Sequence, residues 1–274
     1  MKLFINERTY VTDQDFENLL NMSKEFQTIN LINSPFIVYV YGIAYSFENE
    51  QITLGIVEEF VEMDLSHFLQ EKQEVLSLDE KVNIAINITN GLLEIHHKKF
   101  VHHDIKPANI LITKKGHEFE IKIADFGTCL HADNEIQRLN GLSWNYGAPE
   151  NILHCCFDFP FENTSKSDIW SLGIVFNKIF LDDLNIIFPW SSYFTVRKRN
   201  THDNKIITSI QKEKVKKNHY IAMNAGNLPW EIIVLLNECL QVNFENRPNI
   251  DEILENLIHL KRNLNRFRLK IKRK

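Results

Sequence analysis

Four polar residues between positions 100 and 150 have the types and spacing that phosphoryl transfer requires. Asp104, Lys106 and Asn109 lie within six residues of one another, and Asp125 follows sixteen residues after Asn109. Moving a phosphoryl group to a hydroxyl demands little covalent chemistry from a protein, but it demands oxygen ligands for Mg²⁺ and a carboxylate that orients the nucleophile. Asp104, Asn109 and Asp125 supply that set. Solvated loop charges are the weaker interpretation, because both aspartates lie beside apolar, strand-like runs.

A histidine group near the same residues invites a metal hypothesis. His96, His97, His102 and His103 form two adjacent pairs. Adjacent histidines point in different directions, and no third ligand follows at a fixed spacing, so zinc binding is disfavoured. His102 is better interpreted as a packed structural histidine.

Length and composition limit the classes of protein that can carry these residues. The chain has 274 residues, 44% of them hydrophobic and 24% charged, with only 9 Gly and 7 Pro, which excludes collagen-like and disordered classes. It predicts one large domain or two tightly joined ones. Because neither a membrane span nor a signal peptide is recognisable, we expect a cytoplasmic protein, with the nucleus as the alternative.

The cysteines and the charges add two further expectations. The four cysteines show no C-x-x-C pair and no zinc spacing, so reduced thiols without a disulfide partner are expected. Residues 261–274 hold eight Lys or Arg and no acid, whereas the first 260 residues carry a net charge of −13. This basic tail is compatible with contact to an import receptor, with contact to an anionic surface, and with a solvated helix end.

The elements that must position the chemical residues follow from the periodicity of the apolar side chains. Up to residue 60 strand and helix are mixed: we expect a strand at 2–5, a helix capped by Thr12, strands at 36–45 and 52–60, and a polar turn at 47–50. The first helix should turn one apolar face inward, made of Phe16, Leu19, Leu20, Phe26 and Ile29. After Met63 helices dominate, at residues 78–97, 165–181, 229–239 and 250–259.

Five motifs in this order carry a family resemblance. The segment V-H-H-D-I-K-P-A-N-I (residues 101–110) resembles the H-R-D-x-K-P-x-N catalytic loop of eukaryotic protein kinases, with His103 in place of the arginine. D-F-G at 125–127 and A-P-E at 148–150 follow, then D-I-W-S-L-G at 168–173 and N-R-P at 246–248. One short motif can match by chance, whereas five in sequence order strongly indicate the family.

The resemblance implies a role for each residue at these positions. Asp104 would accept or orient the substrate hydroxyl, Lys106 would stabilise charge on the moving phosphoryl group, and Asn109 and Asp125 would bind Mg²⁺ beside ATP. The structural positions implied by the family are His102, Phe126, Asp168, and an ion pair between Glu150 and Arg247.

Two features bear on the class of kinase and on its control. Lys106 matches the serine/threonine type of loop, and Ser143 stands seven residues before Glu150, where that class commonly has a threonine contacting the catalytic Asp and Lys. In the family, the arginine replaced by His103 pairs with a phosphorylated loop, but residues 129–142 contain no Ser, Thr or Tyr. We therefore hypothesise that phosphorylation of that loop does not activate the chain.

The nucleotide side resembles the family less closely. Glu59 and Val61 match the hinge positions whose backbone pairs with adenine, Asp64 the position that reaches the ribose, and Leu111 the residue under the adenine. Glu58 falls at the gatekeeper position. Burying a carboxylate there without a partner would cost several kcal/mol, so the sequence predicts either a slipped register or a partner for Glu58.

The phosphate-binding part departs furthest from the family. Glu25 is the candidate helix glutamate and Lys2 its candidate lysine partner, with a frayed solvated terminus as the alternative for Lys2, while Lys24 points elsewhere. The glycine-rich loop should precede this lysine, yet the first glycine is Gly42, so two small-lobe strands are expected to be missing. Either the chain is a truncated form of a longer kinase, or it has lost much of its activity.

Together these observations predict an α+β, bilobal protein-kinase-like fold with a truncated β-rich N-lobe and a large, mainly helical C-lobe. The expected division is residues 1–61 (third strand, helix C, fourth and fifth strands), residues 62–260, and the tail 261–274. The predicted function is a serine/threonine kinase that uses MgATP and a protein substrate. The alternative is a catalytically weak pseudokinase scaffold. A-P-E and the Asp168 helix argue against small-molecule kinases of the aminoglycoside type.

Overall fold

The computed structural model describes seven stretches of the chain: residues 13–48, 51–71, 76–116, 118–133, 143–157, 160–181 and 228–271. Their helices and strands run in the following order: α1 (Asp13–Ile32), β1 (Val40–Glu48), β2 (Gln51–Glu58), β3 (Met63–Asp64), α2 (Leu65–Glu71), α3 (Leu78–His97), β4 (Phe100–Val101), η1 (Pro107–Asn109), β5 (Ile110–Lys115), β6 (Glu118–Ile123), β7 (Leu130–His131), α4 (Pro149–Phe157), α5 (Lys166–Leu181), α8 (Trp230–Cys239), η2 (Phe244–Asn246) and α9 (Ile250–Ile271).

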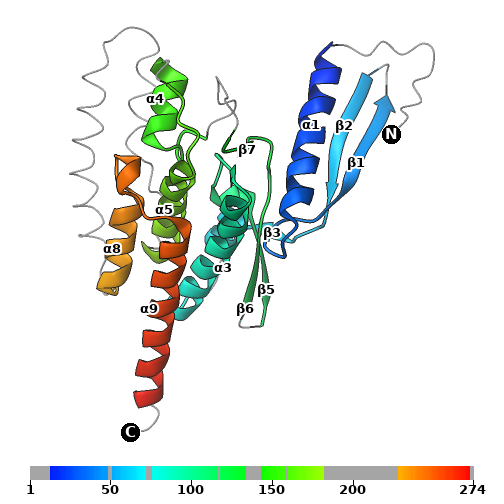
Figure 1. Cartoon of the computed structure of the whole chain (residues 1–274). Helices are drawn as coiled ribbons and strands as arrows, with labels where there is room; N and C mark the ends of the chain where they lie inside the picture. Colours follow the sequence, from blue (N-terminus) through cyan, green and yellow to red (C-terminus); the bar gives the residue numbers. More distant parts are fainter. Residues whose placement is uncertain are drawn as a thin grey trace.

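The described part of the small lobe consists of one helix against a two-stranded sheet. β1 and β2 pair antiparallel from Val40 opposite Glu58 to Glu48 opposite Gln51, and α1 lies along this hairpin (Figure 1). α1 buries Ile29 and Ile32. Leu20, expected on the same apolar face, is 39% exposed, so that part of the prediction was wrong.

The first strand of the small lobe begins later than predicted for a physical reason. Phe36 and Val38 form backbone hydrogen bonds with Ile123 at the end of β6, at 2.8 and 2.9 Å, instead of continuing the ladder with β2. The predicted turn at 47–50 was also too long, because β1 and β2 stay paired as far as Glu48 and Gln51. The expected strand at 2–5, Thr12 and Lys2 lie outside the described residues.

The large lobe is mainly helical (Figure 1). α3 begins with a capping box, in which the Ser77 hydroxyl accepts from the Glu80 N–H and the Glu80 carboxylate accepts from the Ser77 N–H. α3 then packs against β6, α5 and α9. α5 is buried on almost its whole circumference, as expected of a helix at the centre of a core. The protein is therefore α+β, with a small strand-rich N-lobe and a helical C-lobe.

Two strand pairings place the two chemical loops side by side. The chain enters the first loop, residues 102–109, from β4 and leaves it into β5; it enters the second loop, residues 124–129, from β6 and leaves it into β7. β5 pairs antiparallel with β6, and β4 pairs antiparallel with β7. Both ends of the first loop are thus fixed beside the ends of the second.

The remaining helices partly match the prediction. α3 has the predicted bounds, and α5 and α8 each begin one residue later than predicted. The short helices α2 and α4 were not predicted. α9 continues from the predicted end at His259 to Ile271, so most of the basic tail is helical, and Leu264 packs against the core. In the described part of the chain, no helix combines the length and the apolarity needed to span a bilayer.

The contact between α5 and α8 yields a test of this packing. A methyl group at Gly173 would lie 2.8 Å from Cys239 Cβ and 2.9 Å from Leu240 Cδ2. Because overpacking of this kind forces neighbours to move, we predict that Gly173→Ala lowers the free energy of unfolding by about 1–3 kcal/mol in urea denaturation.

Gly55→Ala is the control, since no atom lies within 4 Å of a methyl group at that position. Its effect should stay within about 0.5 kcal/mol. Equal stability of the Gly173 variant and the wild type would contradict the α5–α8 packing.

Candidate active site

A buried carboxylate accepts backbone N–H groups at the start of the first loop. Asp168, near the start of α5, has no solvent exposure, and its two oxygens accept the backbone N–H groups of His102 and His103 at 2.8 Å each. His96 Nε2 lies 2.9 Å from the same carboxylate. Burial by itself raises the pKa of Asp168, but the hydrogen bond from His96 and the neighbouring histidine charges lower it overall, which favours the ionised acceptor.

His102 joins the first loop to the second. Its ring packs on Phe126 with centroids 5.0 Å apart, and its Nε2 lies 3.2 Å from the Ala124 carbonyl oxygen. The Thr128 hydroxyl donates to the His102 carbonyl at 2.9 Å. The described residues contain no group of three or more His, Cys, Asp or Glu arranged to hold a metal. The His102 ring is thus buried between the two loops.

The predicted catalytic residues converge on one carboxylate. Lys106 Nζ donates to Asp104 Oδ2 at 2.5 Å, and Asn109 Nδ2 donates to the same oxygen at 3.0 Å and to the Asp104 carbonyl at 2.9 Å. Lys106 Nζ also donates to Ser143 Oγ at 3.0 Å, so the contact expected for Ser143 is present. Asp104 is 7% exposed, and two neighbours fix its orientation.

The other oxygen of Asp104 has no partner among the residues that the structure describes. Asp104 Oδ1 is buried and accepts no hydrogen bond from them, although an unsatisfied buried acceptor is costly. A substrate hydroxyl that donated to this atom would satisfy it. One oxygen is therefore fixed by the protein, and the other remains available to a ligand.

Asp125 lies at a strained point in the second loop. Its φ is +63°, in the left-handed region that residues other than glycine rarely adopt, and its side chain is exposed. The Ala124 N–H donates to the Asn109 carbonyl at 2.9 Å, which joins the residue before Asp125 to the end of the first loop.

The oxygen atoms of this site suit Mg²⁺. Asn109 uses its amide nitrogen on Asp104, which leaves its amide oxygen for a cation, and Asp125 adds an exposed carboxylate. Mg²⁺ prefers hard oxygen ligands and is commonly held by one or two protein groups together with phosphate and water. Asn109 and Asp125 therefore fit the metal of an MgATP complex.

Three carboxylates meet beside the second loop. Glu25 of α1 accepts the Phe126 N–H at 3.1 Å, as expected if α1 is the helix that carries the phosphate-binding glutamate. Burial raises the pKa of Glu25, with further contributions from Asp125 and Glu58, while the Phe126 hydrogen bond opposes the shift. Burial and the charges of Asp125 and Glu59 also raise the pKa of Glu58. Glu58 ends β2 and is exposed, so it does not carry the cost of a fully buried carboxylate that led us to expect either a slipped register or a partner.

The hinge residues have protein partners of their own. Glu59 donates its N–H to the Tyr39 carbonyl at 2.8 Å, and its carboxylate accepts from Lys122 Nζ at 2.5 Å and from the Tyr39 N–H at 2.7 Å. Asp64 accepts the His67 N–H at 2.9 Å and lies 2.6 Å from His67 Nδ1, which caps the start of α2.

The predicted adenine residues lie close to this hinge. Asp64 is paired with Leu111 across β3 and β5, and Leu111 is opposite Lys122 across β5 and β6. Leu111 is half-buried, and Val61 lies in the link between β2 and β3. Lys122 was not anticipated, and no motif in the sequence marks it.

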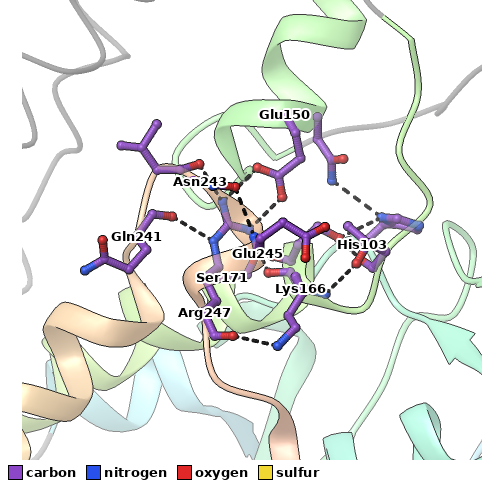
Figure 2. A network of polar contacts seen from close by, with 12 residues as sticks. His103, Glu150, Lys166, Ser171, Gln241, Asn243, Glu245 and Arg247 are labelled. Atoms are coloured by element: carbon purple, nitrogen blue, oxygen red, sulfur yellow. Dashed lines mark hydrogen bonds and ion pairs between the residues drawn. The ribbon is translucent and has the colours of Figure 1, made fainter.

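The expected ion pair between Glu150 and Arg247 is present (Figure 2). Arg247 NH1 and NH2 donate to the two Glu150 oxygens at 2.6 and 2.8 Å, and the guanidinium lies 5.2 Å from the Trp170 ring. Lys166 Nζ donates to the Arg247 carbonyl at 2.6 Å. This network ties α4, which follows Ser143, to the start of α5 and to the chain before α9.

His103 is buried where the family has an arginine. Its ring is 3% exposed and packs against Phe161, with centroids 5.5 Å apart. Burial lowers the pKa of His103 and outweighs the opposing effect of the Asp168 carboxylate, and the charges of His102 and His96 add to the lowering. His103 therefore stays neutral at physiological pH.

Comparison with known proteins yields a single family. A family model described as "Protein kinase domain" matches residues 4–257. The chain is 28% identical over 253 residues to "Probable serine/threonine-protein kinase kinX" of Dictyostelium discoideum, covering 91% of this chain and 20% of that protein.

Two further relatives have kinase names. Identity is 32% over 164 residues to "MAP kinase kinase skh1/pek1" of Schizosaccharomyces pombe, covering 58% of this chain and 42% of that protein. It is 27% over 243 residues to "Stress-activated protein kinase alpha" of Dictyostelium discoideum, covering 86% and 34%. The chain spans less than half the length of each of these three relatives.

The buried neutral histidine predicts a pH dependence of stability. Unfolded His103 takes up a proton near pH 6.5, whereas folded His103 does so only at lower pH. Below pH 6.5 the unfolded state therefore binds more protons, which favours unfolding. We predict that the free energy of unfolding falls more steeply between about pH 7 and pH 5 in the wild type than in His103→Gln. Parallel curves in urea denaturation at each pH would show that folded His103 titrates normally.

Proposed function

The chain belongs to the protein kinase domain family, and on this premise we propose that it is a serine/threonine protein kinase that transfers the γ-phosphate of MgATP to protein hydroxyls. The observation that carries the proposal is the Asp104 carboxylate. Lys106 and Asn109 hold one of its oxygens, and the other is buried without a partner in the described part of the chain. A substrate hydroxyl is the group that this second oxygen could orient.

The proposed mechanism assigns one task to each side chain. Asp104 Oδ1 accepts a hydrogen bond from the hydroxyl, aims its oxygen at the γ-phosphorus, and accepts its proton as the new P–O bond forms and the bond to ADP breaks. Lys106, on the other carboxylate oxygen, stabilises negative charge on the moving phosphoryl group. Asn109 and Asp125 would hold Mg²⁺, which would neutralise phosphate charge when bound.

Serine/threonine preference rests on Lys106 and Ser143. Lys106 Nζ donates to both Asp104 and Ser143, so the loop that carries Asp104 is tied to the segment before α4. The name of one long match, a probable serine/threonine-protein kinase, supports the same class.

The surroundings of Glu25 bear on the alternative of a catalytically weak scaffold, which the comparisons with known kinases do not favour. Glu25 faces Asp125 and Glu58, and among the described residues no lysine or arginine forms an ion pair with it. Three neighbouring carboxylates repel the phosphates of a nucleotide unless a cation lies between them. Lys2, the expected partner of Glu25, lies outside the described residues.

A transfer assay with labelled ATP separates the two functions. We predict that Asp104→Asn and Asp125→Asn each reduce incorporation into a generic protein substrate by about 10²–10⁴-fold, because one loses the proton acceptor and the other a metal ligand. The label should appear on serine and threonine after acid hydrolysis.

Asp133→Asn is the matched control. Asp133 is exposed, and its carboxylate contacts Lys99 and His131 away from Asp104, so this variant should transfer at the wild-type rate. Equal incorporation by the wild type and both active-site variants would exclude transfer by this site, and only the scaffold function would remain.

A further inference from the structure

Asn163 lies between the first loop and the end of β7 and contacts both. It sits in the connection that precedes α5. Its Nδ2 donates to the His131 carbonyl at 2.9 Å and to the Ala132 carbonyl at 3.5 Å, while its Oδ1 lies 3.0 Å from His103 Nε2. One amide therefore connects the residue before Asp104 with the end of β7.

The chemistry of these contacts fixes how the amide and the imidazole are oriented. The His131 and Ala132 carbonyls can only accept, so the amide nitrogen of Asn163 must face them. The amide oxygen then faces His103, and His103 Nε2 must carry the proton. His103 Nδ1 is left as an acceptor, with Asn151 Nδ2 at 3.5 Å and Ser167 Oγ at 3.4 Å. The contact with Asn163 thus requires no charge on either partner.

Both ends of this connection are parts of the chain that the active site depends on. His103 has a φ of +64°, and its N–H is held by Asp168, so its ring is fixed to the backbone that presents Asp104. At the other end β7 pairs with β4, and the Ala132 N–H donates to the Lys99 carbonyl at 2.7 Å. Asn163 therefore reinforces the point where the segment after D-F-G meets the first loop.

The segment that Asn163 contacts, residues 129–142, offers no hydroxyl side chain that could be phosphorylated. Residues 129–142 contain no Ser, Thr or Tyr, so no hydroxyl in this segment can receive a phosphate. An anionic group there would also find a buried, neutral imidazole instead of a cation. Asn163 makes three uncharged contacts here, one with His103 and two with this segment, which also has an exposed ion pair between Asp133 and Lys99.

We propose that Asn163 is a positioning residue, which holds the segment after Asp125 against the first loop through His103 and the His131–Ala132 backbone, in place of a phosphate. The kinetic part of this inference rests on the proposed phosphotransferase function. Its structural part does not, because it concerns backbone contacts that exist in the resting chain.

The experiment compares Asn163→Leu and Asn163→Asp with the wild type in two measurements. Asn163→Leu removes all three contacts. We expect kcat for a generic protein substrate to fall at least about 10-fold, with KM for ATP within about 2-fold, because the loops lose alignment while the hinge is untouched. Hydrogen exchange of the Ala132 amide should become at least about 10-fold faster, and exchange in α5 should not change.

Asn163→Asp separates the two sides of the contact. The aspartate keeps an oxygen for the His103 Nε2–H but places a second oxygen against the two carbonyls. The Ala132 amide should therefore exchange faster, while the ¹⁵N shifts of His103 keep the pattern of a protonated Nε2. This variant has nearly the same shape as the wild type and provides the exchange measurement if the leucine variant fails to fold.

Asn87→Leu is the matched control. Asn87 Nδ2 donates to the Phe119 carbonyl at 2.8 Å between α3 and β6, so its loss removes a similar bond elsewhere in the same lobe. It should lower stability without changing kcat or Ala132 exchange. If the Ala132 amide exchanged at the wild-type rate in both Asn163 variants, the inference would be overturned. A wild-type chain without transfer activity would instead overturn the proposed function, and the exchange measurement would still decide the role of Asn163.

Discussion

The active site depends on one buried carboxylate, that of Asp168, which accepts two successive backbone N–H groups of the first loop. Asp168 has no solvent exposure, and transferring such a charge out of water costs several kcal/mol unless hydrogen bonds compensate. The compensation comes from the N–H groups of His102 and His103 and from His96. The same bonds keep His103 in a left-handed conformation that it would otherwise rarely adopt. Loop geometry and charge burial therefore depend on each other.

Through α5, the helix that contains Asp168, the first loop is connected to the rest of the large lobe. The first turn of α5 contains Asp168, and the neighbouring Trp170 and Lys166 contact Arg247. The Arg247 guanidinium binds Glu150 in a largely buried ion pair (Figure 2). One helix end thus organises both the loop that carries Asp104 and the segment around α4. The two antiparallel pairings, β5 with β6 and β4 with β7, then place Asp125 beside that loop without long connections.

The sequence predicted what is local or fixed by motif spacing, and missed what depends on tertiary partners. α3 follows from its apolar periodicity, and Asp104, Lys106 and Asn109 from the spacing within one loop. The start of β1 was misplaced because the preceding residues bond β6, about 85 positions away along the chain. Likewise, the contact of His96 with Asp168 and that of Asn163 with His103 join residues separated by 72 and 60 positions. Single polar residues at such separations leave no periodic signal, so only the fold reveals their partners.

The hold of Asp168 on the first loop can be measured through the two amide hydrogens that it accepts. In native-state hydrogen exchange of the wild-type chain, the account predicts that the His102 and His103 amides exchange as slowly as those in the centre of α5, because both are buried and donate to an ionised carboxylate. Exchange of these two amides at the rate of an exposed loop, while α5 stays protected, would contradict it.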